Sequence, residues 1–563
     1  MVVTKSREGV ALLYCISFIL LFPISTFSQD HTDWSYNLGL YEVNVRQYTE
    51  DGTFAAFETH LDRLKEMGVG ILWFMPINPI GVKNRLGSLG SYYSVKDYMD
   101  VNPEFGNLDD FKSLVELAHS MGFSVIIDWV ANHTAWDNDL TISHPEWYTK
   151  DGNGDFTPPA GTDWSDVIDL DYSNQGLREY MTDAMKFWIT ETDIDGFRCD
   201  AATMVPLDFW ETAITELKGV KPEILMLAEA DGIEYQEAGF DMTFAWELYG
   251  FGDGVLPKIV DGSFNANFLA SFLRGEFTDY DSNHYRLYFT SNHDENSWNG
   301  TVFERFGDAA ENFAALTLTM NSMPLIYGGQ EAGLNKRLQF FDKDQIIWNA
   351  HPFANVYSTL LHLKRENKAL WNGNLGGDAV RVLTNNNPNV FSFIREKENN
   401  KIFAVFNLTD TIQNVVPTGT LFLGEYVNVF TSDAITFTEN SQIELQPWGY
   451  KIFKDTLSTT MIFENDEFST EYILEQNYPN PFNPSTKINF TIPSVGRSGT
   501  SPYNTKLIVC DILGCEVKTL INKSMRPGNY EIEFDGTDLP SGIYFYRLSS
   551  GGFAQTKKML LLK

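Results

Sequence analysis

Cysteine is scarce in this sequence, and the cysteines it has do not form an obvious set of disulfide pairs. There are 4 in 563 residues, and Cys15 lies in an apolar N-terminal segment that indicates an export signal. The remaining Cys199, Cys510 and Cys515 are an odd number, which in an exported protein argues against a disulfide framework. A local bridge between Cys510 and Cys515 stays open, because the two residues flank a turn at Gly514.

Positive charge is also low. The chain has 41 Lys and Arg against 75 Asp and Glu, which makes a formal net charge of -34. A chain of this charge repels phosphate backbones and anionic lipid headgroups, so we expect no nucleic-acid partner and a neutral ligand. With 43% hydrophobic and 21% charged residues, the composition is that of a globular protein.

Long hydrophobic runs are missing after the N-terminus. The apolar run from Val10 to Ile24 follows Lys5 and Arg7 and precedes a plausible cleavage point after Ser28. It is shorter than the roughly 18 residues that a bilayer span needs. We therefore predict a signal peptide over residues 1–28 and no membrane insertion of the mature protein.

The long N-terminal region has neither an internal repeat nor a glycine-rich phosphate loop, and short apolar runs alternate there with segments of helical period. The first helical segment, "FAAFETHLDRLKEMG", stops at Gly68. The apolar runs are "YEVNVRQY", "GILWFMP", "FSVIIDWV", "GFRCDA", "EILMLAEA", "FDMTFAW", "RLYFTSNHDE" and "PLIYGG". Eight alternations predict an α/β fold, a (β/α)8 TIM barrel over residues 29–376. A doubly wound open sheet is the rival, but its phosphate loop is not found here.

Shifts in composition divide the rest of the chain. Residues 134–171, after the third run, are rich in Pro, Gly, Asp and Trp and indicate a small inserted domain. Alternating apolar residues predict an all-β domain over 377–454. A polar linker over 455–472 leads to a last β-patterned unit, which we expect to be sandwich-like, over 473–563.

Polar residues close four of the apolar runs. The C-terminal ends of barrel strands lie on one face, so these side chains should converge there. They are Asp128, Asn132 and His133 after the third run, Arg198 and Asp200 after the fourth, Glu229 after the fifth, and His293 and Asp294 after the seventh. Arg198 and Asp200 lie two residues apart on one strand, so their side chains share a face.

These residue types suit acid and base chemistry on a sugar. We expect Arg198 to lower the pKa of Asp200 and keep it ionised, as a carboxylate nucleophile requires. Burial would keep Glu229 protonated, as a general acid must be, and Asp294 could stabilise an oxocarbenium-like state. Each residue alone has a structural alternative, an ion pair or a satisfied histidine, but four such strand ends favour a site.

The segments "DWVANH", "GFRCDAATM", "LAEAD" and "FTSNHD" resemble, in this order, the sequence regions of glycoside hydrolase family 13, the α-amylase family. The resemblance extends over about Asp30 to Lys454 and implies that the inserted segment is the family's domain B and the all-β unit its domain C. It implies that Asp200 is the nucleophile, Glu229 the general acid and base, and Asp294 the transition-state stabiliser.

The same resemblance implies roles for the neighbouring residues. Arg198, His133 and His293 would hold the sugar in the cleavage subsite, and Asp128 would support Arg198. Tyr93, in "GSYYSVKDY", would stack under that sugar; from the sequence alone, a core aromatic is an equal alternative.

The implied reaction is double displacement with retention of the α configuration, without an organic cofactor. We expect endo cleavage of α-1,4-glucans and maltooligosaccharides; hydrolysis of maltodextrins or cyclodextrins, or glucan transfer, is the alternative. Thr203 and Met204 stand where many α-amylases have a Lys-His pair, which leaves the leaving-group subsite open. Rival hypotheses are a glycan-binding protein on an inactive barrel and a structural adhesin; an intact acid and nucleophile favour the enzyme.

Calcium is a further expectation from the resemblance. Asn132 and Asp169 stand where many relatives place side-chain ligands of a structural Ca2+, which prefers oxygen ligands. The stretch "DGNGDF" from Asp151 is similar to the start of a calcium loop, but Thr162 replaces the bidentate Glu, so a glycine-rich turn is the better interpretation.

The C-terminal unit resembles a type IX secretion sorting domain in "LEQNYPNPFNPSTKINFTIP", "GNYEIEFDGTDLPSGIYFYRL" and "KKMLLLK". This resemblance implies the type IX machinery as a partner, a Gram-negative source, and a secreted or cell-surface location. The alternative is an adhesion or carbohydrate-binding β-sandwich. We expect the mature protein to be a monomer.

Overall fold

The computed structural model describes residues 31–250, 253–280, 283–456 and most of 472–563, where the gaps are 494–502, 513, 515, 526–527, 538 and 552. The predicted signal peptide, most of the predicted linker, and Cys515 of the Cys510–Cys515 pair lie outside the described residues. Across the described part of the chain, every helix is too short or too polar to cross a bilayer.

Eight parallel strands close into a barrel, which confirms the predicted fold class. Each strand falls on one of the eight apolar runs, and three of the strands begin one residue before their run. The strands are β1 (Leu40–Val43), β2 (Ile71–Phe74), β3 (Ser124–Val130), β6 (Gly196–Asp200), β7 (Leu225–Ala228), β8 (Met242–Phe244), β9 (Tyr285–Tyr288) and β10 (Met323–Tyr327). They follow one another around the barrel in chain order, and β10 closes it by pairing Leu325 with Leu40.

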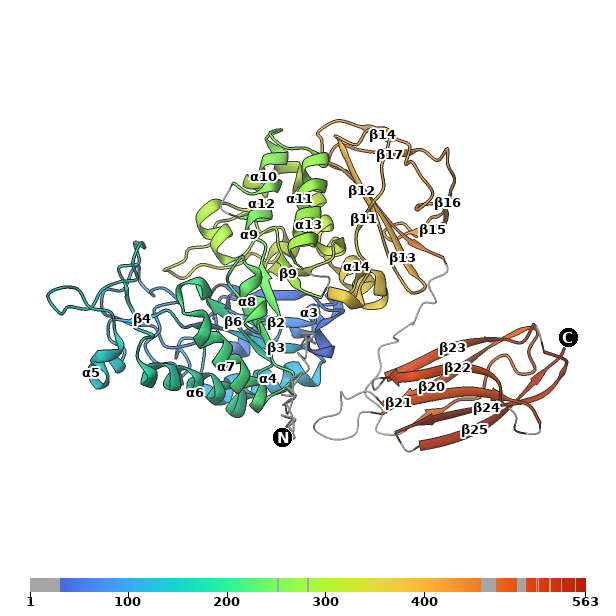
Figure 1. Ribbon diagram of the computed structural model, residues 1–563, viewed down its shortest axis with the longest axis horizontal. Coiled ribbons are helices and arrows are strands. Elements are labelled where there is room, and N and C mark those ends of the chain that lie inside the picture. Colours follow the sequence, from blue (N-terminus) through green and yellow to red (C-terminus); the bar gives the residue numbers. More distant parts are fainter. Residues whose placement is uncertain are drawn as a thin grey trace, which may run out of the picture.

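Helices cover the outside of the barrel (Figure 1). Up to β8 they are α1 (Val45–Tyr48), α2 (Phe54–Glu58), α3 (Leu61–Met67), α4 (Leu108–Ser120), α6 (Gln175–Thr192), α7 (Leu207–Val220) and α8 (Ile233–Glu237). After β8 come α9 (Trp246–Tyr249), α10 (Val255–Val260), α11 (Ala266–Asp279), α12 (Val302–Phe306), α13 (Ala310–Thr319) and α14 (Pro352–Glu366). The first expected helix is split into α2 and α3, and α3 ends at Gly68 in a left-handed cap with φ 92°.

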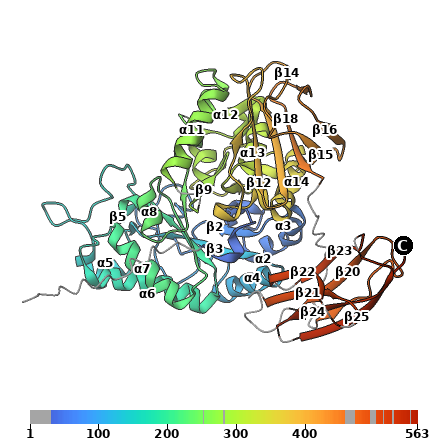
Figure 2. The same ribbon diagram turned by 45° about the vertical axis from the view of Figure 1, so that its right-hand side comes forward.

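Helix α4 illustrates why the sequence folds in this way. It starts with a capping box between Asn107 and Asp110, which satisfies two backbone N–H groups at the helix start. Phe111, Leu114 and Val115 recur at helical spacing and are buried against the barrel. Figures 1 and 2 show α4, α6 and α7 side by side on the outside of the barrel.

The segment that we predicted as an insertion forms a lobe, at the left in Figure 1, that contains β4 (His133–Ala135), α5 (Leu140–Ser143) and β5 (Val167–Asp169). Strands β4 and β5 pair antiparallel, with His133 opposite Asp169. The lobe therefore begins at the C-terminal end of β3 and keeps His133 beside the barrel.

The predicted all-β domain has one six-stranded sheet in the order β11-β12-β13-β18-β15-β16 and a β14-β17 pair. Its strands are β11 (Val380–Arg381), β12 (Val390–Lys397), β13 (Asn400–Asn407), β14 (Gln413–Val415), β15 (Gly424–Asn428), β16 (Ala434–Phe437), β17 (Ile443–Leu445) and β18 (Tyr450–Asp455). Phe391, Phe393 and Phe406 belong to the same hydrophobic core as the barrel. Barrel and β-domain are thus packed as one body.

The C-terminal unit consists of two antiparallel sheets around a core of its own, which agrees with the sandwich-like prediction. Strands β19 (Ile473–Leu474), β20 (Ser485–Ile492) and β23 (Gly528–Asp535) form one sheet. The other sheet has β22 (Glu516–Met525), β21 (Tyr503–Cys510), β24 (Gly542–Ser550) and β25 (Phe553–Leu561).

Candidate active site

The guanidinium of Arg198 lies at the centre of the predicted cluster, at the C-terminal ends of three neighbouring strands. Its Nη1 donates to Asp128 Oδ1 at 2.9 Å and to Asp200 Oδ1 at 3.0 Å, and its Nη2 lies 2.9 Å from Glu229 Oε2. Arg198 is 1% exposed. One buried cation therefore holds three carboxyl groups from β3, β6 and the end of β7, and it faces the ring of Trp73 at 5.3 Å.

A second chain of contacts joins His293 to this cluster. His293 Nδ1 lies 2.5 Å from Glu42 Oε1, and Nε2 lies 2.7 Å from the Tyr93 hydroxyl. Tyr93 donates its only hydroxyl proton to Asp128 Oδ2 at 3.1 Å, so it must accept a hydrogen bond from Nε2. Because Nδ1 faces a carboxylate, both ring nitrogens carry protons, and His293 is an imidazolium.

The charges around His293 agree with this assignment. Burial lowers the pKa of His293, but the nearby charges of Asp294 and Glu42 outweigh burial and raise it to about 9. Asp294 Oδ2 lies 3.4 Å from His293 Nε2, and its side chain is 26% exposed. The structure therefore brings Asp294 and Tyr93 to the same site as Asp128 and Arg198.

The protonation of Asp200 differs from the expectation. Arg198 lowers the pKa of Asp200 as predicted, but burial has the larger effect and raises it to about 7. Burial likewise raises the pKa of Glu229 to about 7, against the effect of Arg198 and with a contribution from the charge of Asp200. Both pKa values therefore lie near neutral pH, where neither carboxyl group is fully ionised. An anion beside a protonated acid is the state that acid and nucleophile chemistry needs.

Two structural details distinguish Asp200 from Glu229. Ala201 has φ 42°, a left-handed conformation that costs a non-glycine residue about 1 kcal/mol or more. This conformation lets its N–H donate to Glu229 Oε2 at 2.7 Å. Asp200 Oδ2 is buried and has no hydrogen-bond partner among the described residues. Glu229 is thus fixed in place, while Asp200 keeps one oxygen available.

His133 lies at the edge of the same site. It is 3% exposed, and burial lowers its pKa to about 4, against a hydrogen bond to the backbone of Tyr93, so it is neutral. The ring of Trp164, from the inserted lobe, lies 5.3 Å from that of His133 and is 37% exposed. Neutral and aromatic side chains of this kind suit contact with an uncharged sugar.

The expected calcium ligands do not form a site by themselves. Asn132 Nδ2 lies 3.3 Å from His133 Nδ1, and burial raises the pKa of Asp169. Across the ranges that the structure describes, no group of three or more His, Cys, Asp and Glu side chains is arranged to hold a metal ion. Two side chains are too few for the six to eight oxygens of a Ca2+ site, so calcium binding stays a prediction and no step is assigned to it.

The sequence analysis did not identify three residues that contact the site, which are Glu42, Ala201 and Trp164. Glu42 is fully buried on β1, and an acidic residue inside the apolar run "YEVNVRQY" is a signal that could have indicated it. The conformation of Ala201 and the contact of Trp164 depend on the folded chain and leave no local signal.

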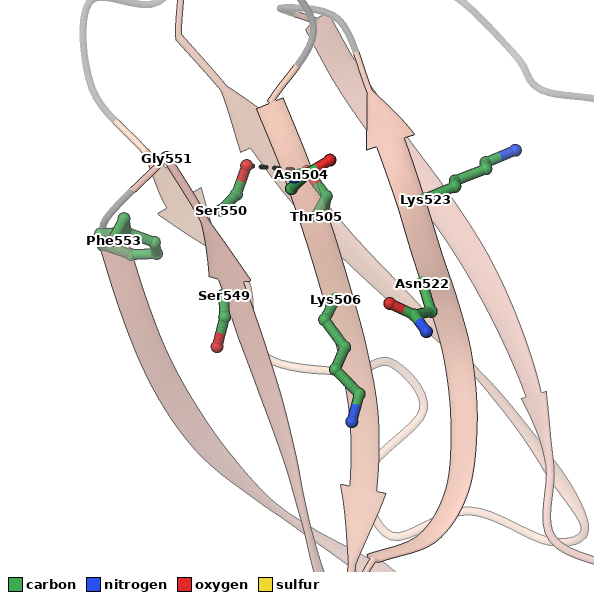
Figure 3. A pocket seen from close by; sticks show the side chains of 9 residues that line it. All are labelled: Asn504, Thr505, Lys506, Asn522, Lys523, Ser549, Ser550, Gly551 and Phe553. Carbon is green, nitrogen blue, oxygen red and sulfur yellow. Dashed lines mark hydrogen bonds between the residues drawn. The ribbon is translucent and has the colours of Figure 1, made fainter. Parts of the chain in front are cut away.

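A shallow concavity of about 510 Å³ lies on the C-terminal unit and differs in kind from this site (Figure 3). Its lining residues are Asn504, Thr505, Lys506, Asn522, Lys523, Ser549, Ser550, Gly551 and Phe553. Ser550 and Thr505 are hydrogen-bonded to each other at 2.7 Å. This lining includes lysines, amides and hydroxyls but no carboxyl group, so it does not offer the same chemistry.

Models of known families match almost the whole described chain. The model of the α-amylase catalytic domain matches residues 25–164 and 147–374, and that of the α-amylase C-terminal all-β domain matches 381–455. The model of a secretion system C-terminal sorting domain matches 476–562. The sorting domain indicates a secreted or cell-surface protein.

Individual relatives agree with the family models. The chain is 27% identical over 440 residues to α-amylase MalA of Haloarcula japonica, covering 73% of this chain but only 62% of that protein. It is 26% identical to α-amylase 3 of Dictyoglomus thermophilum over 69% of this chain and 88% of that one. The chain is also similar to the crystal structure of a noncanonic maltogenic α-amylase from Thermotoga neapolitana, with 30% sequence identity and a TM-score of 0.67. The match covers 74% of this chain and 98% of the Thermotoga chain. The chain belongs to glycoside hydrolase family 13, the α-amylase family.

Proposed function

We propose that this enzyme is a secreted, retaining hydrolase that cleaves internal α-1,4 bonds of starch-like glucans and maltooligosaccharides. The observation that supports it most is the arrangement around Arg198. That residue holds Asp200 and Glu229 together, while Oδ2 of Asp200 is left without a hydrogen-bond partner among the described residues. A buried, unshared carboxylate oxygen next to a protonatable Glu fits a nucleophile paired with an acid.

In the first step, Asp200 Oδ2 attacks the anomeric carbon, and the bond from that carbon to the glycosidic oxygen breaks. Glu229 gives its proton to the departing oxygen, which leaves as a sugar hydroxyl. Asp294 stabilises the positive charge that develops on the sugar ring. The result is a glycosyl ester on Asp200 and an ionised Glu229.

In the second step, Glu229 takes a proton from a water molecule, whose oxygen attacks the anomeric carbon and frees Asp200. The sugar leaves with its α configuration retained. Around the ring, Tyr93 supplies a stacking face, and Arg198 and the imidazolium of His293 supply positive charge behind the carboxyl groups and Tyr93. Neutral His133 contacts a hydroxyl from the side of the lobe.

Export would use the type IX machinery of a Gram-negative bacterium, with the C-terminal unit as its sorting signal. The family match of residues 476–562 supports this route. Removal of that unit on export belongs to the same proposal.

The experiment that tests the function is the product profile of the purified mature protein on soluble starch, maltooligosaccharides and cyclodextrins, with Asp200→Asn as the control. Rapid loss of polymer length with mixed oligosaccharides, abolished in the variant, is the expected result. Maltose as the main product would favour a maltogenic enzyme, for which similarity to the Thermotoga protein is the motivating observation. Larger transfer products would favour a glucanotransferase. Binding without turnover would overturn the hydrolase.

A further inference from the structure

Trp298 is a large aromatic side chain that the proposed chemistry does not use. It is 52% exposed and lies four residues after Asp294, in a π-helical turn over Glu295–Asn299. Full burial of a large apolar side chain stabilises the folded state by about 1.5–3 kcal/mol. The half-exposed indole of Trp298 therefore contributes less to folding than a buried one would. A single exposed aromatic ring is ordinary, and what matters is its surroundings.

Trp298 is the outer end of a row of rings that starts in the catalytic site. Its ring lies 5.2 Å from that of Phe340 and 5.8 Å from that of Phe341. Phe340 in turn lies 6.2 Å from Tyr93 with only 11° between the ring planes. Since Tyr93 contacts Asp128 and His293, the row leads from the cleavage position to solvent.

The protein holds this row in place with polar contacts behind it. Asn296 accepts from the Leu338 N–H at 2.9 Å and donates to the Lys336 carbonyl at 3.1 Å. The Ser297 hydroxyl donates to the Leu338 carbonyl at 3.1 Å. The turn that bears Trp298 is thus tied to the loop that bears Phe340, and a surface positioned in advance loses little entropy when it binds a ligand.

Two cations beside the row are paired with carboxylates of the protein. Arg337 donates to Glu304 at 2.9 Å, and Lys336 is paired with Asp344. A flat aromatic surface with paired charges around it suits a neutral ligand with an apolar face, such as a pyranose ring. It suits an anionic ligand poorly.

We propose that Trp298, supported by Phe340 and Phe341, binds a glucose unit of the same α-glucan chain, outside the unit held over Tyr93. The inference rests on the proposed function and extends it: it makes the enzyme prefer chains long enough to reach Trp298. Shorter substrates occupy only the inner positions.

The test compares Trp298→Ala and Trp298→Phe with wild type on maltotriose and maltoheptaose. We expect Trp298→Ala to raise KM for maltoheptaose about tenfold with kcat nearly unchanged, and to leave maltotriose unaffected, because an aromatic contact is worth about one power of ten in binding. Trp298→Phe keeps a ring and should recover most of the loss. Phe268→Ala is the matched control, since Phe268 is an aromatic residue that is 41% exposed on α11.

A binding measurement separates this subsite from a structural role. In an Asp200→Asn background, calorimetric titration with maltoheptaose should give a Kd about tenfold higher when Trp298 is changed to Ala. Equal losses for both sugars, or no change in KM and Kd, would overturn the inference and leave the hydrolase proposal standing. If wild type turns over neither sugar, the hydrolase proposal fails, and the titration alone decides whether Trp298 holds a glucan.

Discussion

Two buried arginines, Arg198 in the candidate active site and Arg395 between barrel and β-domain, have different partners and opposite pKa shifts. Arg198 faces three carboxyl groups, whose charges raise its pKa well above the usual range despite its burial. Arg395 is fully buried among backbone carbonyls, and burial lowers its pKa to about 9. It donates to Gly377 at 2.7 Å, to Met320 at 2.6 Å and to Trp371 at 2.7 Å.

The difference teaches that a buried charge does not by itself mark a functional site. The carbonyl oxygens that accept hydrogen bonds from Arg395 are neutral and do not titrate, so that residue connects two domains. The carboxyl groups around Arg198 outnumber the cation, and burial raises the pKa values of Asp200 and Glu229 into the neutral range. Excess negative charge in a buried place costs stability and makes a proton available for chemistry.

The largest expected effect is that of Asp200→Asn. We expect kcat to fall by about 10⁴-fold or more, because the variant has no nucleophilic oxygen. Melting temperature should stay the same or rise, since one of the crowded negative charges is removed. Enzyme assays and thermal unfolding of the same preparation check both parts.

The control for Asp200→Asn is Asp208→Asn, which removes an exposed carboxylate paired with Arg178 and should change neither quantity. A strong fall in melting temperature for Asp200→Asn would mean that the site is held together like the Arg395 contact. With that outcome, the surroundings of Arg198 and of Arg395 would no longer differ in how they contribute to stability.

Arg395→Met should have the opposite effects, a loss of stability with little change in kcat. It leaves several buried carbonyls without a donor, so we expect the free energy of unfolding to fall by about 3–5 kcal/mol. The folded fraction at low temperature should keep the wild-type kcat. Denaturant unfolding measures the first quantity, and Arg337→Met, at an exposed ion pair with Glu304, is the matched control with an expected change of under about 1 kcal/mol.

Glu42→Gln tests the imidazolium of His293. A group whose pKa is raised from 6.5 to about 9 contributes stability fully at a pH below 6.5 and loses that contribution as the pH rises through 9. The variant should therefore be destabilised more at pH 6 than at pH 10.

Thermal unfolding of the variant and wild type at the two pH values checks the Glu42 prediction. Asp183→Asn, an exposed carboxylate paired with Lys186, is the control and should show no pH-dependent difference. Equal destabilisation of Glu42→Gln at the two pH values would contradict a charged His293.

The smallest effect is expected at Ala201. Ala201→Gly relieves the left-handed strain and keeps the N–H that binds Glu229, so stability should change by no more than about 1 kcal/mol and kcat by less than tenfold. Ala201→Val, whose branched side chain resists φ 42°, should lower kcat more than Gly does. Equal kcat values for the two variants would show that this N–H does not position the acid.

Much of the fold could be predicted from the sequence, and the reasons are local. Strand and helix periods identified eight runs that became the eight barrel strands, and Gly68 marked a helix end. The spacing of Arg198 and Asp200 predicted a shared face, and the structure joins them at 3.0 Å. The predicted direction of the Asp200 pKa shift was wrong, because pairing was visible in the sequence and the depth of burial was not.

The sequence by itself determined the order of strands and helices, the polar residues at the strand ends and the change from barrel to β-domains. These follow from contacts between residues two to four positions apart. Only the tertiary structure decided that Glu42 charges His293, that Ala201 binds Glu229, and that Phe340 links Tyr93 to an exposed Trp298. Those contacts join residues far apart in the chain, and only the pairing of the barrel strands and the packing of the loops after them bring these residues together.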